Sequence, residues 1–298
     1  MKSRRLLIIF LIVLVGLVLL TLVTPDAPAS SYYRNIERPL VIAHQGGDGI
    51  WPGDTMFAFE NAVKIGVDVL EMDAHITKDR QIVLMHDEEV DRTTNGTGLV
   101  EDLTLDELKQ LDAAYKWSND DGNTFPFRGQ RIQVPTLEEL FQTFPQMHYV
   151  IEIKLTRNPI DKPLCDLIRE HNMQDNVVVA SFHDEAMQNF RAICPEVATS
   201  ASRSEVTTFV LLGKIFLSGL VAPQYESIQP PYDPAESKNI PIMTRRFIRE
   251  AHAKNIAVEP WTVDDPELMK QYIEWGVDGI MTDRPDLMVE VLKQMGID

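Results

Sequence analysis

A regular alternation between short apolar runs and segments of helical periodicity constrains the fold of this chain more than any other feature. The apolar runs after residue 39 are mostly continuous rather than alternating with polar residues. They predict strands at 40–44, 67–73, 82–86, 148–154, 177–181, 197–201, 256–263 and 276–282. Predicted helices separate most of them, at 55–65, 104–112, 136–144, 160–171, 184–193, 203–216, 244–254, 266–275 and 285–295.

Strands that are apolar along their whole length are typical of a parallel sheet covered by helices on both faces. Eight such units over about 260 residues predict an α/β fold, a TIM (β/α)8 barrel over residues 39–298, rather than an open sheet. Two irregularities stand out. The connection between Asp73 and Gln81 is too short for a helix, and residues 95–135 form a small insertion expected to lie over one end of the barrel.

The N-terminus carries the apolar run "LLIIFLIVLVGLVLLTLV" at 6–23, preceded by basic residues within 1–5. About 20 apolar residues span a bilayer, and basic flanks stay on the cytoplasmic side. The pattern predicts a cytoplasmic segment at 1–5, a transmembrane helix at 6–23 and a linker at 24–38. The remainder of this single-pass membrane protein would then lie on the outward side, periplasmic, extracellular or luminal. The alternative is a signal peptide cleaved near Ala27, which would release a secreted protein.

Charge and cysteine content exclude some classes of partner and site. A net charge of −17 at pH 7 disfavours nucleic acid and anionic lipid head groups as electrostatic partners. The two cysteines, Cys165 and Cys194, form no CxxC motif, so neither a thiolate zinc site nor a disulfide framework is indicated. A single disulfide between them outside the cytoplasm stays open as an alternative.

Polar side chains gather at the carboxyl ends of the predicted strands, which is where a barrel carries its chemistry. The residues selected by this rule are His44, Glu71, Asp73, His86, Asp87, Glu152 and Lys154. Residues two apart on a strand point the same way, so Glu71 shares a face with Asp73, and Glu152 with Lys154. The rule therefore predicts one polar cluster at one end of the barrel.

The carboxylates of this cluster favour a metal site. Burying a carboxylate without a partner costs several kcal/mol, and Lys154 alone cannot neutralise Glu71, Asp73 and Glu152. A hard divalent cation, Mg²⁺ or Ca²⁺, balances an all-oxygen set better. The alternative is a salt bridge to Lys154 without a metal.

The two histidines favour acid/base catalysis. His44 and His86 each follow a predicted strand and adjoin a turn rich in Gly or Asp, and such a pair can serve as general acid and general base. Lys154 could hold a phosphate as a point charge, and Trp261 could line the substrate pocket. The alternatives are a histidine buried in the core, a structural ion pair and a packing tryptophan.

Several sequence blocks together resemble one enzyme family. They are "AHQGG", "PGDT", "GVDVLEMDAHITKD", "VLMHDEEVDRTTNGTG", "IEIK", "VVVASF" and "WTVDDPELMKQYIEWGVDGIMTDRPD", in this order from residue 40 to residue 286. On these blocks the chain resembles the glycerophosphodiester phosphodiesterase family.

The resemblance implies a TIM barrel that uses a divalent metal, Mg²⁺ or Ca²⁺, to hydrolyse glycerophosphodiesters to an alcohol and glycerol 3-phosphate. A neighbouring glycerol hydroxyl would attack phosphorus, and water would open the resulting cyclic phosphate. His44 and His86 would be the catalytic acid and base, and Lys154 would bind phosphate. The implied metal ligands are Glu71, Asp73 and Glu152.

The chain departs from the family pattern at two places. Gln45 stands where the family's H-R-G motif has its phosphate-binding arginine, and Gly53-Asp54 stand where P-E-N-T has its metal-binding glutamate. Our hypothesis is that Asp54 turns inward as a replacement ligand, helped by the flexible Gly53. The alternative is a site with one ligand fewer.

Three hypotheses of function follow. The first is hydrolysis of glycerophosphodiesters such as glycerophosphocholine or glycerophosphoethanolamine. The second is a lysophospholipase D, for which the apolar stretch 209–223 would contact lipid, unless it is core. The third is a barrel that only binds its ligand and has lost turnover through Gln45 and Gly53.

Overall fold

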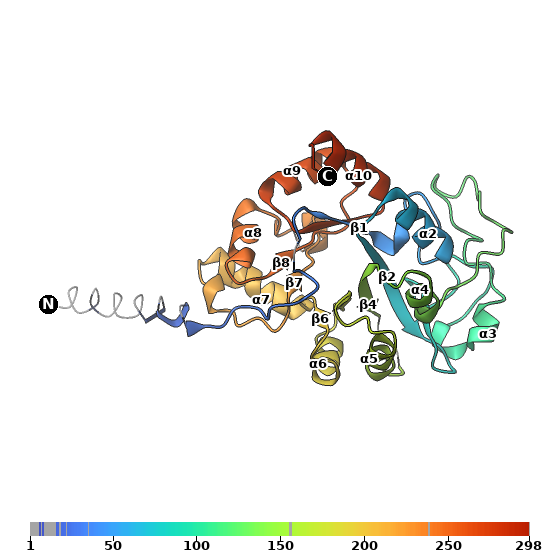
Figure 1. The fold of residues 1–298 in the computed structure, drawn as a ribbon, viewed down its shortest axis with the longest axis horizontal. Helices are drawn as coiled ribbons and strands as arrows, with labels where there is room; N and C mark the ends of the chain where they lie inside the picture. The colour runs from blue at the N-terminus through green and yellow to red at the C-terminus, as the bar shows by residue number, and fades with distance from the viewer. Residues whose placement is uncertain are drawn as a thin grey trace.

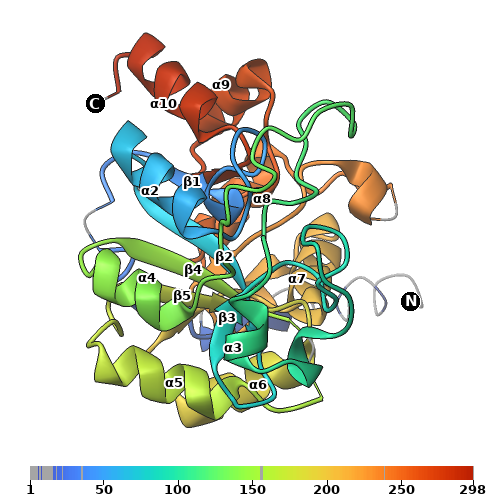
Figure 2. The ribbon, with the colours of Figure 1, turned by 90° about the vertical axis from the view of Figure 1, so that its right-hand side faces the viewer.

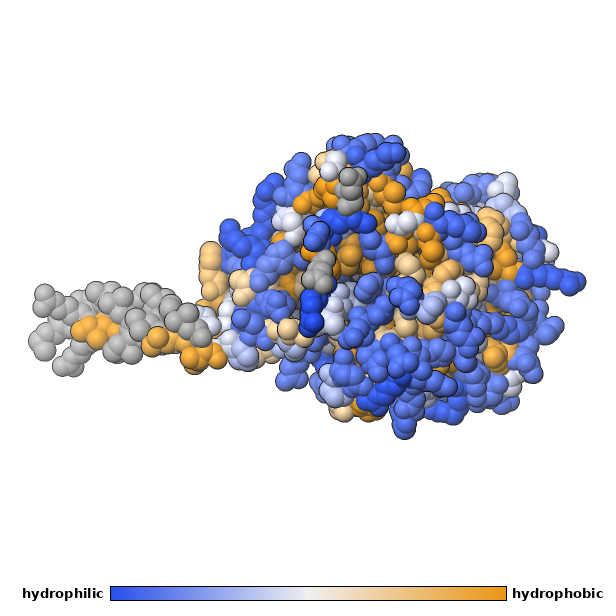
Figure 3. Space-filling view, viewed as in Figure 1, coloured by the Kyte–Doolittle hydropathy of each residue, from blue (hydrophilic) through white to orange (hydrophobic). Residues whose placement is uncertain are grey.

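A computed structural model of the chain shows a ring of strands enclosed by helices (Figure 1). The face drawn in Figure 3 is mostly hydrophilic, in keeping with the net charge of −17. The structure describes residues 6, 8, 16–17, 19–21, 23–34, 36–154, 157–237 and 239–297.

The ring consists of two parallel sheets. Its strands are β1 (Leu40–Ala43), β2 (Val69–Ile76), β4 (His148–Ile153), β5 (Val177–Ala180), β6 (Ala198–Thr199), β7 (Ser227–Ile228), β8 (Ala257–Val258) and β9 (Gly279–Thr282). The first sheet has the order β6-β5-β4-β2-β1-β9, and β7 pairs with β8 in the second. A parallel bridge between Ser200 and Ser227 joins the sheets on one side. On the other side Met281 N–H donates to Pro260 O at 3.0 Å. The prediction of a TIM-like barrel is confirmed.

The helices begin and end at residues suited to those positions. They are α2 (Met56–Ile65), α3 (Leu105–Leu108), α4 (Leu137–Thr143), α5 (Asp161–Glu170), α6 (Asp184–Ile193), α7 (Arg203–Lys214), α8 (Arg245–His252), α9 (Pro266–Trp275) and α10 (Pro285–Gln294). The Asp265 side chain caps α9 by accepting from the N–H groups of Glu267 and Leu268. Gly276, at φ 87°, ends the same helix in a left-handed conformation. Each of the predicted helices is present with boundaries shifted by a few residues.

One strand predicted for the barrel, at 82–86, lies outside the ring. The run 82–86 gives β3 (Ile82–Leu84), which pairs antiparallel with the extended end of β2 and stands outside the ring. This pairing accounts for the short connection after Asp73, because an antiparallel neighbour needs only a turn. The eighth barrel strand is instead β7, which the sequence did not predict. Its two residues precede Pro230 and Pro231 and form no recognisable apolar run.

The insertion at 95–135 contains η2 (Val100–Asp102) and α3 and lies along the side of the molecule that Figure 2 faces. It packs through a small apolar cluster onto β3. The cluster consists of Val83, Met85, Val90, Val100, Leu108, Ala113 and Val134. The insertion also reaches the barrel mouth, since Trp117 Nε1–H donates to Asp48 Oδ1 at 3.0 Å.

The structure corrects the predicted membrane anchor. The predicted span at 6–23, like the basic segment at 1–5, falls largely outside the described residues. Within the described part of the chain, no helix has the length and apolarity that crossing a bilayer requires. The longest described helix, α7, has 12 residues, whereas a span needs about 20. The predictions of a transmembrane helix and of a single-pass membrane location are therefore not supported.

Residues 24–34 and 36–38, which belong to the predicted linker at 24–38, lie against the amino-terminal end of the barrel. Ala27 N–H donates to Lys254 O at 2.8 Å, and the buried Lys254 ammonium donates to Pro25 O at 2.7 Å. Arg38 pairs with Asp68 at 2.8 Å. Tyr32 is buried among the inward-facing residues of the strands, which include Ile42, Val69, Val150, Val178, Ala198 and Met281. This segment closes the base of the barrel.

A buried glutamate lies beside this closure. Glu259 is fully buried, and its Oε2 accepts from Gln229 Nε2 at 2.9 Å and from the Tyr33 hydroxyl at 3.2 Å. Its Oε1 has no hydrogen-bond partner among the described residues. Burial raises the pKa of Glu259 from 4.5 to about 7.

Cys165 of α5 and Cys194, just after α6, form a disulfide with a Cα–Cα distance of 5.8 Å. The sequence indicates no disulfide framework, since it has no CxxC motif, and the structure contains the single disulfide that stood as the alternative. The bond ties together two neighbouring helices of the outer layer.

We expect Glu259→Gln to change how stability depends on pH. The folded state retains the Glu259 proton between pH 4.5 and about 7, so this residue lowers the free energy of unfolding as pH rises through that window. Glutamine has no proton to lose, so the variant should gain of the order of 3 kcal/mol relative to wild type between pH 5 and pH 8. Urea unfolding at several pH values measures this difference. The exposed Glu267→Gln is the control, and parallel pH profiles for Glu259→Gln and wild type would contradict the prediction.

Candidate active site

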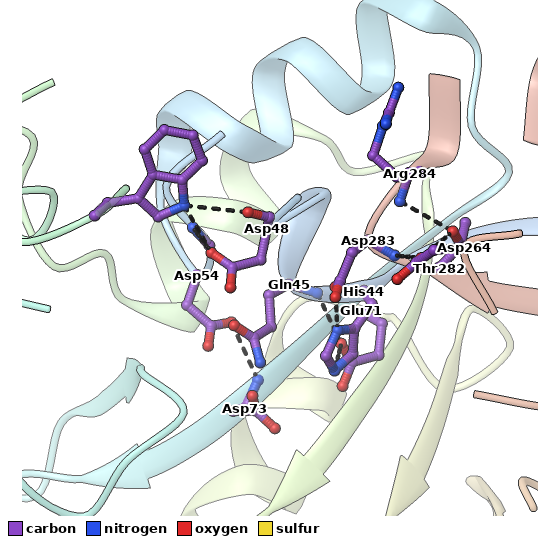
Figure 4. Close-up of polar contacts among 12 residues, drawn as sticks. His44, Gln45, Asp48, Asp54, Glu71, Asp73, Asp264, Thr282, Asp283 and Arg284 are labelled. Carbon is purple, nitrogen blue, oxygen red and sulfur yellow. Dashed lines mark hydrogen bonds and ion pairs between the residues drawn. The ribbon is translucent and has the colours of Figure 1, made fainter. Parts of the chain in front are cut away.

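His44 directly follows β1 and is the first residue of η1 (His44–Gly46). Its Nδ1 lies 2.6 Å from Asp283 Oδ1, and its Nε2 lies 3.9 Å from Glu71 Oε2 (Figure 4). Burial alone would lower the pKa of His44, but the carboxylates of Glu71 and Asp283 outweigh it and raise the pKa to about 10. Asp283 therefore fixes the ring and leaves Nε2 as the nitrogen directed to the carboxylate cluster.

Glu71, Asp73 and Glu152 form that cluster. One carboxylate oxygen from each lies within 4.8 Å of the others. Glu71 and Asp73 are two residues apart on β2, so their side chains point to the same face of the sheet. Glu152 of β4 pairs in register with Asp73 of β2. The sheet itself therefore brings the three carboxylates together. Burial, followed by repulsion from neighbouring carboxylates, raises the pKa of Glu71 to about 8. Burial also raises the pKa of Glu152, which Lys154 partly offsets.

Lys154 is the first residue after β4 and contacts two of these carboxylates. Its Nζ lies 2.9 Å from Asp73 Oδ1 and 3.2 Å from Glu152 Oε1. Burial would lower the pKa of Lys154, yet the charges of Asp73 and Glu152 raise it above its ordinary value. Lys154 is therefore a charged ammonium at the centre of the cluster.

The single ammonium of Lys154 does not pair with every oxygen of the three carboxylates. Asp73 is 1% exposed, and its Oδ2 has no hydrogen-bond partner among the described residues. Asp54 Oδ2 is likewise buried without a partner in the described part of the chain. A buried carboxylate in this state either keeps a proton or is paired with a cation, and all-oxygen ligands suit Mg²⁺ or Ca²⁺. The cluster thus fits a divalent metal.

His86 lies beside the same residues, although the strand that precedes it does not belong to the barrel ring. It lies just beyond β3, outside the barrel ring, and its Nδ1 is 2.8 Å from Asp87 Oδ1. Asp87 in turn accepts from Arg92 Nε at 2.6 Å. Arg92 is therefore engaged in an ion pair that orients the carboxylate beneath His86.

The loop that departs from the family pattern is tightly packed. Gln45, at φ 50°, donates its N–H to Glu71 Oε2 at 2.9 Å, and its carbonyl accepts from Asp54 N–H at 2.9 Å. A Cβ placed on Gly53 would lie 2.7 Å from Gln45 Oε1 and 2.8 Å from Asp48 Oδ1. A side chain at position 53 would require the Gln45 and Asp48 side chains to move, so the two departures from the family pattern are in direct contact.

Asp54 is held in the left-handed region at φ 53°, which aspartate tolerates better than most residues. Its Oδ1 accepts from Asp73 N–H at 3.3 Å, as Figure 4 shows. Burial, then repulsion from Asp73 and Glu71, raises its pKa. The side chain thus faces the cluster, but it lies outside the set whose oxygens are all within 4.8 Å of one another.

A cavity of about 550 Å³ opens over these residues. Its lining includes His44, Glu71, His86, Glu152, Lys154 and Trp261. Trp261 contributes its ring while its Nε1–H donates to Gln229 O at 2.7 Å. Most of the predicted site residues therefore line one cavity, with Gln45, Asp54 and Asp73 buried beside it. A recess of about 760 Å³ lies next to it but contains none of the three clustered carboxylates.

Two features of the site were not predicted. Asp283 directly follows β9, so the rule used for the other strand ends would have selected it. Asp48 accepts from Gly53 N–H at 2.9 Å and from Trp117 Nε1–H at 3.0 Å. No sequence signal couples Asp48 to Trp117, because the contact joins the loop after β1 to the aperiodic insertion.

Comparison with known proteins agrees with this geometry. The model of the glycerophosphoryl diester phosphodiesterase family matches residues 44–287. A glycerophosphodiester phosphodiesterase of Caldanaerobacter subterraneus is 32% identical over 267 residues, covering 87% of this chain and 100% of that protein. The chain belongs to the glycerophosphoryl diester phosphodiesterase family. A family member is a phosphoric diester hydrolase, which favours the enzyme over the barrel that only binds its ligand.

Two further similarities concern the fold and the activities for which relatives are named. A crystal structure of a Silicibacter pomeroyi protein named for the same activity has a TM-score of 0.74 at 22% identity, covering 91% of this chain and 99% of that one. It shows a common fold. A lysophospholipase D of Homo sapiens is 28% identical over 276 residues, covering 84% of this chain and 85% of that protein.

We expect Lys154→Met to destabilise the metal-free protein. The substitution leaves Asp73 and Glu152 without their counter-charge, and breaking a buried pair from one side costs about 3 kcal/mol or more. A bound divalent cation supplies the missing charge, so the loss should shrink when Mg²⁺ or Ca²⁺ replaces EDTA. Urea unfolding of wild type and variant in both conditions measures the difference.

The matched control for this substitution is Lys162→Met, which removes an exposed i,i+4 pair with Asp166. Its stability should change by about 0.5 kcal/mol or less in either condition. An equal loss for Lys154→Met with and without cation would contradict the charge balance described above.

Proposed function

We propose that this family member hydrolyses glycerophosphodiesters, such as glycerophosphocholine or glycerophosphoethanolamine, to an alcohol and glycerol 3-phosphate. The observation that carries the proposal is the convergence of two histidines, a charged lysine and two of the clustered carboxylates on one cavity, with the third carboxylate, Asp73, buried beside it. The relatives named for this activity support it.

The metal ligands in this proposal are Glu71, Asp73 and Glu152, with Asp54 as a fourth. The uncompensated oxygens of Asp73 and Asp54 support the assignment. When bound, a divalent cation would neutralise phosphoryl charge as a Lewis acid. Asp54 would join the other three through a small side-chain movement, because its Oδ2 has no bond to break among the described residues.

The chain's own residues would bind the phosphate and move the protons. Lys154 is the ammonium nearest the cluster and would contact a phosphate oxygen, and Gln45 would stand in for the family's arginine nearby. His44, fixed by Asp283, and His86, fixed by Asp87, each have Nδ1 engaged and Nε2 left to exchange a proton. One would accept the proton of the attacking hydroxyl, and the other would protonate the departing alcohol oxygen.

A second activity would use the same residues on a larger substrate. A lysophospholipase D cuts the bond between phosphorus and the head-group alcohol, as glycerophosphodiester hydrolysis does. The similarity to a protein of that name supports this extension, and Trp261 would then line the wall of a longer pocket.

His44→Ala should abolish metal-dependent release of glycerol 3-phosphate from glycerophosphocholine. The full chain is assayed in EDTA and after addition of Mg²⁺ or Ca²⁺. Loss of a group that transfers a proton costs about 10²–10⁴-fold in rate. His252→Gln, at a histidine paired with Asp278 away from the cavity, should keep wild-type activity. Absence of turnover by wild type with any metal would refute the proposed function.

Asp54→Ala should weaken metal binding. If Asp54 is a ligand, the dissociation constant for Mg²⁺ or Ca²⁺ measured by calorimetry should rise about tenfold or more. Asp112→Asn is the control, because Asp112 is similarly buried but bonds to Ala114 and Gly129 in the insertion. Unchanged affinity in Asp54→Ala would refute its role as a replacement ligand.

A further inference from the structure

Besides the two histidines, two cationic side chains face the catalytic cavity. Among the described residues that line it, they are Lys154, directly after β4, and Arg203, the first residue of α7. Both also line the neighbouring recess of about 760 Å³. They therefore lie on the boundary that the cavity and the recess share, and both border the space in which a substrate would lie.

The two cations differ in how far their charge is already neutralised. Lys154 Nζ is paired with Asp73 at 2.9 Å and with Glu152 at 3.2 Å. The Arg203 guanidinium forms no ion pair or hydrogen bond with another residue in the part of the chain that the structure describes. Within that part of the cavity lining, Arg203 is therefore the cation whose charge is free to meet a ligand.

Aromatic packing positions the Arg203 guanidinium without neutralising it. Its Cζ lies 5.3 Å from the centroid of the Phe182 ring. Phe182 in turn packs edge-on against Trp261, with ring centroids 5.6 Å apart, and both rings line the cavity. A cation–π contact attracts the charge to the ring and leaves the N–H donors available. The guanidinium is thus held beside the cavity with its donors unused.

Gln45 does not supply a second charge. Its side chain is 6% exposed and lies toward Gly53, since a Cβ at that residue would be 2.7 Å from Gln45 Oε1. It is buried beside the cavity and does not belong to its lining. An amide there can donate a hydrogen bond, but the charge of a phosphate has to be balanced by another group.

We propose that Arg203 is a phosphate-binding residue of this site and holds the phosphodiester together with Lys154. The planar fork of a guanidinium matches a pair of phosphate oxygens, which an ammonium cannot do. Attack on phosphorus adds negative charge to these oxygens, so the contact strengthens in the transition state and contributes to kcat. This inference rests on the proposed phosphodiesterase function and adds a residue to it.

The first test measures phosphate binding without turnover. Glycerol 3-phosphate is titrated by calorimetry into the full chain with Mg²⁺ or Ca²⁺ present. Its dissociation constant should rise about tenfold or more in Arg203→Gln, the range for a hydrogen bond to a charged group. Arg203→Lys keeps the charge and loses the fork, so it should fall between wild type and Arg203→Gln. The dissociation constant for Ca²⁺ should stay unchanged in both variants, because Arg203 contacts none of the clustered carboxylates.

The second test measures the same contact in the reaction. In Arg203→Gln, kcat for glycerophosphocholine should fall about 10²-fold, by a larger factor than KM rises. Glycerophosphoglycerol, whose head group is uncharged, should show the same loss, because the contact is with the phosphate that both substrates share. A loss confined to one of the two substrates would assign Arg203 to the head group and overturn the inference.

The matched control is Arg245→Gln. The Arg245 guanidinium also lies over an aromatic ring, 5.8 Å from the Trp275 centroid, but Arg245 lines neither the cavity nor the recess. This variant should leave binding and kinetics unchanged. Wild-type affinity for glycerol 3-phosphate and wild-type kcat in Arg203→Gln would overturn the inference and leave the proposed function standing. A matching rise in its Ca²⁺ dissociation constant would also overturn it, by showing general damage to the site. Failure of wild type to hydrolyse either diester would instead refute the proposed function.

Discussion

The constraint on which the catalytic end of this barrel depends is the confinement of three carboxylates, two buried and one partly buried, within 4.8 Å of one another. Like charges in a low-dielectric environment repel strongly, so the rest of the rim is arranged to offset them. Lys154 supplies one positive charge, His44 supplies another when protonated, and backbone N–H groups of Gln45 and Asp73 point at carboxylate oxygens. The remaining imbalance is the reason that a divalent cation fits here.

The sequence predicted the elements whose ends are marked by residues within the element itself. Helices with an N-terminal cap and a terminal glycine, such as α9, were located within a few residues, because their signals are local. The sequence failed where pairing decides the structure. The run 82–86 has the composition of a barrel strand, yet it pairs antiparallel with β2. β7 is held in the ring by its neighbours rather than by its own two residues.

The same distinction applies to the site. Glu71, Asp73 and Glu152 were predictable because strand geometry fixes both the face and the end of the barrel on which they lie. Asp283 obeys the same rule, because it directly follows β9. The close approach of the Gln45 side chain to Gly53 could not be predicted, since it depends on left-handed backbone at residues 45 and 54. Contacts of this kind appear only once the loop has been folded against the strands.

The closure of the barrel base by residues 24–34 and 36–38 has a consequence for the orientation of the barrel. The contacts of this segment with Lys254, His148 and Asp68 all lie at the amino-terminal ends of strands. The cavity opens at the opposite, carboxyl ends. The amino-terminal segment therefore packs against one end of the barrel, and the cavity proposed to bind substrate opens at the other. A support or fusion partner attached ahead of residue 24 would leave the cavity mouth facing away from it.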